Sequence, residues 1–108
     1  MAAYTSPGLK IGQLVFSKAG RDRGRPFLVF KITGDGFAYV VDGDLRRVAR
    51  PKRKNIKHLQ PTNRVDRELA ARIEAGRIPT DAEIRRALAA LTGVPGGEEE
   101  GDGEKGGY

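Results

Sequence analysis

Three short apolar runs, each bounded by turn-forming residues, limit this chain to a fold built mainly from β-strands. They are rich in Val, Phe, Ile, Tyr and Leu and span residues 12–18, 26–32 and 37–42. Between the last two runs, Gly34 and Gly36 can adopt the positive φ of a tight turn, which predicts a hairpin. Two further segments, 45–49 and 55–59, bring the expected strands to five. This spacing of short strands predicts a small barrel or sandwich.

The second of these runs is apolar on both faces of its expected strand. Phe27 and Val29 fall on one face, and Leu28, Phe30 and Ile32 fall on the other. Because successive side chains of a strand point to opposite faces, the pattern does not say which set is turned inward.

After residue 61 the apolar spacing becomes helical. Apolar residues recur at every fourth position at Val65, Leu69 and Ile73. Gly76 is placed to end this first helix. Thr80 and Glu83 then form the capping-box pattern of a second helix. Its apolar stripe comprises Ile84, Ala87, Leu88 and Leu91. The two helices are expected to pack as a helical hairpin.

Composition divides the chain into four segments. Residues 1–8 carry no periodic pattern and are expected to form a flexible arm. A barrel over 9–62 and a helical hairpin over 63–92 follow. Residues 93–108 are almost wholly Gly and acidic residues, so they cannot offset the entropy cost of ordering and are predicted to be a disordered acidic tail.

Positive charge is concentrated in the barrel segment. The whole chain has a net charge of +6, but residues 9–64 hold 14 basic and 4 acidic residues. Residues 65–92 are neutral, with 5 of each sign, and residues 93–108 hold 1 basic and 5 acidic residues. The barrel segment is therefore the expected binding surface for a polyanion.

The Gly/Arg loop, residues 19–25, is the most informative segment. Gly20 and Gly24 allow a sharp turn and a close approach to a phosphate. Three planar guanidinium forks, those of Arg21, Arg23 and Arg25, are expected to point outward toward phosphate or guanine. The alternative is a hairpin turn whose charges are merely solvated.

A second basic group follows the third run. It comprises Arg46, Arg47, Arg50, Lys52, Arg53, Lys54 and Lys57. Like charges at this density repel one another unless a polyanion neutralises them, so we include this group in the RNA-binding set together with Lys18 at the end of the first run. The alternative is a strand edge made soluble by its charges.

The residues needed for catalysis or metal binding are not found. The chain has no cysteine, and its one histidine, His58, lacks a predicted carboxylate partner. No metal-ligand set, Walker sequence or dinucleotide fingerprint occurs. We therefore expect no enzyme activity, no cofactor, no metal and no small-molecule substrate.

Two further features concern location. The first residues lack the basic and apolar regions of a signal peptide, and no apolar run approaches the roughly 18 residues that span a bilayer. The absence of cysteine fits a reducing compartment. We expect a cytoplasmic protein with no membrane partner.

Residues 11–25 resemble a KOW motif, with Gly12 opening the first strand, Val15 within it, and Gly20 and Gly24 in the loop. Together with segments 27–32, 38–43 and 46–48, the stretch from 9 to 62 resembles the KOW-type large-subunit ribosomal proteins of archaea and eukaryotes. That resemblance implies an SH3-like barrel that contacts ribosomal or other structured RNA through the Gly/Arg loop and the adjoining basic strand ends. The chain departs from the pattern at Arg25, where a later glycine is common, and its helices and tail look more like a stand-alone bacterial relative.

The sequence thus predicts a non-catalytic RNA-binding protein, associated with the large ribosomal subunit or acting in translation or ribosome assembly. Two alternatives stay open. SH3-like barrels also bind peptides, although such modules usually present an aromatic groove and this chain has no Trp. A KOW transcription-elongation factor would instead have polymerase as its partner.

Overall fold

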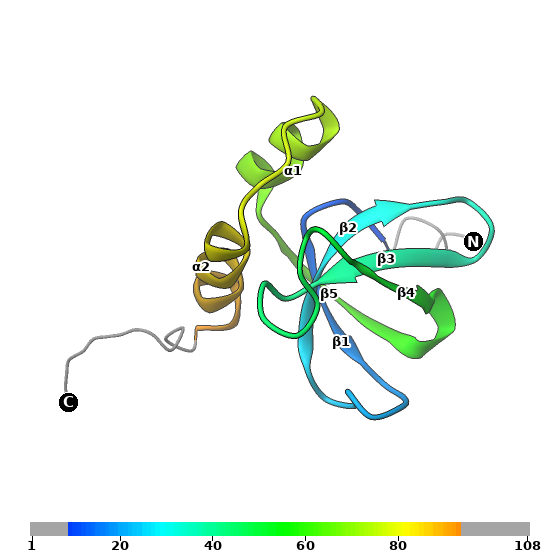
Figure 1. Ribbon diagram of the computed structural model, residues 1–108. Helices are drawn as coiled ribbons and strands as arrows, with labels where there is room; N and C mark the ends of the chain where they lie inside the picture. Colours follow the sequence, from blue (N-terminus) through cyan, green and yellow to red (C-terminus); the bar gives the residue numbers. More distant parts are fainter. Residues whose placement is uncertain (1–8, 94–108) are drawn as a thin grey trace, which may run out of the picture.

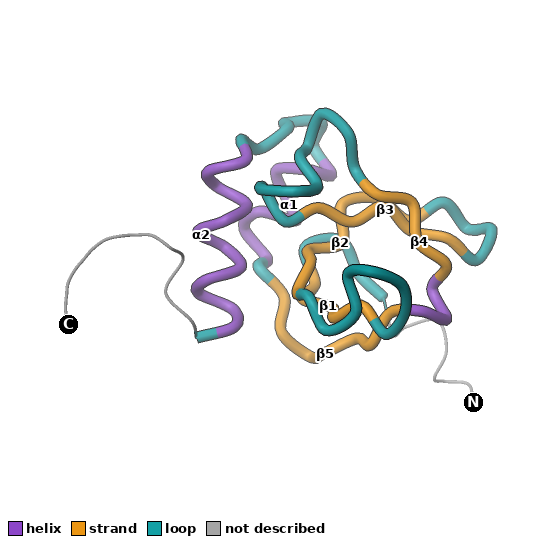
Figure 2. Tube along the Cα trace, turned by 60° about the horizontal axis from the view of Figure 1, so that its bottom comes forward, coloured by secondary structure: helices purple, strands orange, loops and turns teal. Residues whose placement is uncertain are grey.

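One antiparallel sheet of five strands, in the order β4-β3-β2-β1-β5, curls into a barrel-like ring (Figures 1 and 2). The computed structural model describes residues 9–93. Its strands are β1 (Gln13–Ser17), β2 (Pro26–Ile32), β3 (Phe37–Val41), β4 (Lys52–Asn55) and β5 (Leu59–Val65). The three apolar runs of the sequence are β1, β2 and β3, and β2 and β3 are paired as expected. The predicted fold class, mainly β with helices after the barrel, is confirmed.

Both faces of β2 are buried, which explains its continuous apolar pattern. Phe27 and Val29 lie in the cluster inside the ring. Leu28 lies in a second cluster on the outer face of the sheet, which α2 (Asp81–Thr92) covers (Figure 2). A shift in the pairing register between Val29 and Lys31 changes the alternation, because an extra residue in a strand reverses which face the next side chains occupy.

The second helix begins where its capping box predicts, but Val65, which the apolar spacing assigned to the first helix, is instead the last residue of β5. Asp66 accepts a hydrogen bond from the Leu69 N–H at the start of α1 (Arg67–Glu74). At the start of α2, Thr80 and Glu83 form the complete capping box. The helices are joined by an ion pair of 2.8 Å between Arg72 Nη2 and Glu83 Oε2. Neither helix within residues 9–93 is long and apolar enough to cross a membrane.

The prediction of a strand at residues 45–49 is wrong. These residues form turns, because side-chain carboxylates bind the backbone donors that a neighbouring strand would otherwise take. Asp42 Oδ1 accepts from the backbone N–H groups of Asp44 and Arg46, and Asp81 Oδ1 accepts from that of Val48.

The predicted strand at 55–59 is also replaced. Residues 52–55 form β4, a short 3-10 helix follows at Ile56–His58, and β5 then pairs with β1 as far as Gln13 opposite Val65. The sheet therefore continues beyond residue 62, where we expected the barrel to end. The predicted arm at 1–8 and the predicted tail, apart from Gly93, lie outside the described residues.

Candidate nucleic-acid interface

The Gly/Arg loop joins β1 to β2 as a tight turn. Gly20 and Gly24 both have φ of +84°, as the sequence predicts. The Gly24 N–H donates to the Ser17 carbonyl oxygen at 2.7 Å, which closes the loop at its base. Arg21 and Arg23 are exposed between these glycines. The loop thus carries two solvated guanidinium groups on a closed backbone turn.

Lys54 of β4 is anchored to this loop. Its ammonium lies 3.1 Å from Asp22 Oδ1 and also donates to Ser17 Oγ and to the Ala19 carbonyl oxygen. Only 9% of the Lys54 side chain and 14% of the Asp22 side chain are exposed. Lys54 was predicted from its charge to face RNA, but in the structure its ammonium is bound by oxygens of the protein itself.

The carboxylate of Asp42 connects the Gly/Arg loop to the segment after β3. Its Oδ2 accepts from Arg25 Nη2 at 3.2 Å, and its Oδ1 accepts from the Arg46 N–H at 2.8 Å. Asp42 is buried. Arg25 was expected to point outward, but this ion pair ties its guanidinium to the buried Asp42 carboxylate and leaves 41% of its side chain exposed. Arg25 Nε is buried and has no hydrogen-bond partner among the described residues.

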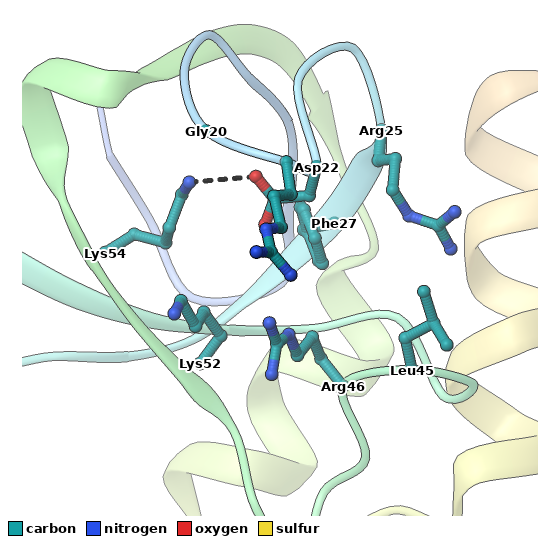
Figure 3. A pocket seen from close by; sticks show the side chains of 9 residues that line it. Gly20, Asp22, Arg25, Phe27, Leu45, Arg46, Lys52 and Lys54 are labelled. Carbon is teal, nitrogen blue, oxygen red and sulfur yellow. Dashed lines mark hydrogen bonds and ion pairs between the residues drawn. The ribbon is translucent and has the colours of Figure 1, made fainter.

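These links bring part of each of the two basic groups of the sequence to one place. They surround a cavity of about 390 Å³ between the Gly/Arg loop, the segment after β3, and β4 (Figure 3). It is lined by Gly20, Arg21, Asp22, Arg25, Phe27, Leu45, Arg46, Lys52 and Lys54. We call this the cation-lined cavity.

The other predicted binding residues do not line this cavity. All of them are exposed, namely Lys18, Arg23, Gly24, Arg47, Arg50, Arg53 and Lys57. Arg53 lies between the two lysines of β4, so its side chain points to the opposite face of the strand. Its guanidinium carbon is 3.7 Å from the centre of the Phe37 ring, and it pairs with Asp35. The structure therefore gathers one part of the predicted set and leaves the rest spread over the surface.

Sequence reasoning missed the residues that organise the cavity. Asp22 and Asp42 hold its basic side chains, and Leu45 and Phe27 supply its apolar wall. A signal for Asp22 was present, because an acid between two arginines can pair within a basic loop. Asp42 before Gly43 also fits a turn in which the carboxylate accepts from the following backbone N–H groups.

The Asp22–Lys54 pair predicts how acid affects stability. Burial alone would raise the pKa of the Asp22 carboxyl, but hydrogen bonds from Ser17 and Lys54 and the Lys54 charge outweigh it, so the pKa is lowered. A lowered folded-state pKa contributes stability above pH 3.8, the ordinary value, and that contribution is lost as the pH falls further. Urea unfolding at pH 7 and pH 3 should therefore show a smaller acid-induced loss in Asp22→Asn than in the wild type.

Exposed Asp44 supplies the control for this measurement. Asp44→Asn should keep the wild-type loss on acidification. Asp22→Asn should still lose some stability in acid, because the Thr80 backbone N–H and Arg72 also lower the pKa of Glu83. Equal losses in Asp22→Asn and the wild type would contradict a role for the Asp22 carboxylate.

Comparison with known proteins supports a ribosomal relationship. No protein-family model matches the chain. The chain is 29% identical over 82 residues to the large ribosomal subunit protein eL14 of Desulfurococcus amylolyticus, covering 76% of this chain and 78% of that protein. An alignment of this length is longer than the barrel, so the likeness includes residues outside it. The predicted resemblance to the KOW-type large-subunit ribosomal proteins is thereby confirmed.

Proposed function

We propose that this protein binds RNA of the large ribosomal subunit, without catalysing a reaction, and that the cation-lined cavity is the centre of its binding surface. The main support for this proposal is that basic residues from three separate segments of the chain lie around one cavity. Arg21 of the Gly/Arg loop, Arg46 after β3 and Lys52 of β4 line one cavity although they are distant in the sequence. Asp42 links the Gly/Arg loop to the segment after β3, so these two segments are held together before any RNA binds.

The local charge favours a phosphate backbone. Asp22 and Asp42 each pair with one of the basic residues at the cavity, which leaves Arg21, Arg46 and Lys52 without an ion pair among the described residues. Arg23 adds an exposed charge on the same loop. Guanidinium groups form bidentate contacts to phosphate, and charges of one sign gathered in this way are stabilised by a polyanion.

The relative supports ribosomal RNA as the partner, since that protein is named as a component of the large ribosomal subunit. It also supports a structural role on cytoplasmic ribosomes. A peptide-binding barrel would need an exposed aromatic groove. Here Phe27 is fully buried and Phe37 lies beneath Arg53, so the structure favours RNA over a peptide.

Salt-dependent binding to a fragment of large-subunit ribosomal RNA tests the proposal. The triple variant Arg21→Gln, Arg46→Gln, Lys52→Gln should bind about 100-fold more weakly near 0.15 M salt. Its plot of log affinity against log salt should be shallower by about 2 to 3, because each lost phosphate contact removes about 0.7 to 0.9 from the slope. Fluorescence anisotropy at four or more salt concentrations measures both quantities.

The matched control removes three exposed arginines elsewhere, in Arg67→Gln, Arg77→Gln, Arg86→Gln. It loses the same formal charge from the helical part of the chain, and we expect a loss of only a few-fold. If the control weakens binding as much as the cavity variant does, the binding surface is not at the cavity. A wild-type slope near zero would contradict electrostatic RNA binding altogether.

A further inference from the structure

The exposed side chain of Leu45 is the least expected feature of the cation-lined cavity. Leu45 is 65% exposed, and among the described residues only Ile78, at 60%, is a comparably exposed large hydrophobic residue. A single exposed leucine needs no explanation on an ordinary surface. Leu45, however, forms a wall of the cavity and stands at its rim beside Arg46 (Figure 3). The cavity thus combines an apolar wall with cationic sides.

The size of the cavity limits what can enter it. Pockets for small ligands measure roughly 300 to 1,000 Å³, and this cavity, at about 390 Å³, lies near the lower end. A paired RNA helix is far too wide for it and could only lie across its mouth. A single nucleotide that has left its helix is of suitable size, and RNA-binding proteins commonly recognise such unpaired bases.

We propose that the cation-lined cavity takes one unpaired RNA nucleotide, with its base against Leu45 and the Arg46 guanidinium and its phosphate on Arg21 and Lys52. This inference rests on the proposed function and specifies the ligand of the same site. An arginine plane stacks on a base while keeping its charge, and an apolar side chain contacts the base without a preference for sequence.

Two further contacts favour this occupant. The Arg46 backbone is held by Asp42, so the segment that carries Leu45 is ordered before the ligand arrives and less entropy is lost on binding. Arg25 Nε is a buried donor with no acceptor among the described residues. We expect a ribose or phosphate oxygen of the bound nucleotide to supply that acceptor.

Three RNA hairpins of one sequence test the inference: one with a single-nucleotide bulge, one with an abasic residue at the bulge, and one fully paired. The wild type should bind the bulged hairpin about tenfold more tightly than the abasic one. Leu45→Ser should remove most of that difference and leave binding to the paired hairpin unchanged. A 2-aminopurine at the bulge should change its fluorescence on binding the wild type more than on binding Leu45→Ser.

Ile78→Ser is the matched control, because Ile78 is about as exposed as Leu45 but does not line the cavity. It should keep the full preference for the bulged hairpin. Equal, salt-dependent binding of all three hairpins by the wild type would overturn the nucleotide site and leave RNA binding standing. Failure to bind any of them at low salt would contradict the proposed function itself. If Leu45→Ser weakens all three equally, Leu45 does not contact the base and the inference is wrong.

Discussion

Replacing Gly43 with alanine should lower the free energy of unfolding by about 4 kcal/mol and loosen α2 from the barrel. Gly43 has φ of +77°, which alanine adopts only with strain. A Cβ here would also overlap the carbonyl oxygen of Asp81 and lie 3.0 Å from Arg85 Cγ, both at the start of α2. The close approach is used for a hydrogen bond, since Arg85 Nη1 donates to the Gly43 carbonyl oxygen.

Gly34→Ala is the matched control for this prediction. Gly34 has a similar φ of +81°, but an added Cβ would meet no atom within 4 Å. The free energy of unfolding of Gly34→Ala should therefore fall only by the cost of placing alanine in a left-handed backbone conformation, about 1 to 2 kcal/mol. Chemical unfolding of both variants, followed by circular dichroism, measures the difference. Equal losses would show that contact between Gly43 and α2 does not constrain the fold.

Two lysines of β4 should have separable roles. Lys54→Met should cost about 3 kcal/mol of stability, because it leaves the Asp22 carboxylate largely buried beside no cation. Lys52→Met should change stability by less than about 0.5 kcal/mol, as expected for a partly exposed side chain, and should weaken RNA binding several-fold. Thermal and chemical unfolding, together with RNA titration well below the melting temperature, measure the two effects.

A second-site variant provides the internal check. Asp22→Asn in the Lys54→Met background should recover part of the lost stability, since it removes the uncompensated charge. No recovery would mean that Lys54 stabilises the fold by packing. Loss of RNA affinity in folded Lys54→Met as great as in Lys52→Met would show that Lys54 also contacts RNA.

Several elements could be predicted from the sequence because their determinants are local. Thr80 and Glu83 lie only three residues apart, so the capping box that begins α2 can be recognised from a short stretch of sequence. The strands β1, β2 and β3 are marked by apolar runs between turn residues, and the positive φ of Gly20 and Gly24 follows from their places in a tight loop. The concentration of basic residues in the barrel segment can likewise be read directly from the composition of that segment.

The remaining features of the fold and the site were determined by contacts between residues that are distant in the sequence. Lys52 and Lys54 look alike in the sequence, and only the fold places the second beside Asp22, 32 positions away, and buries it. Residues 45–49 carry a strand-like pattern, but Asp81, 33 positions from Val48, takes a backbone hydrogen bond that a strand would have used. The two apolar faces of β2 could be distinguished only once the ring enclosed Phe27 and α2 covered Leu28. A side chain's partner across the fold determines whether it is buried, paired or free to bind, and local spacing does not encode that partner.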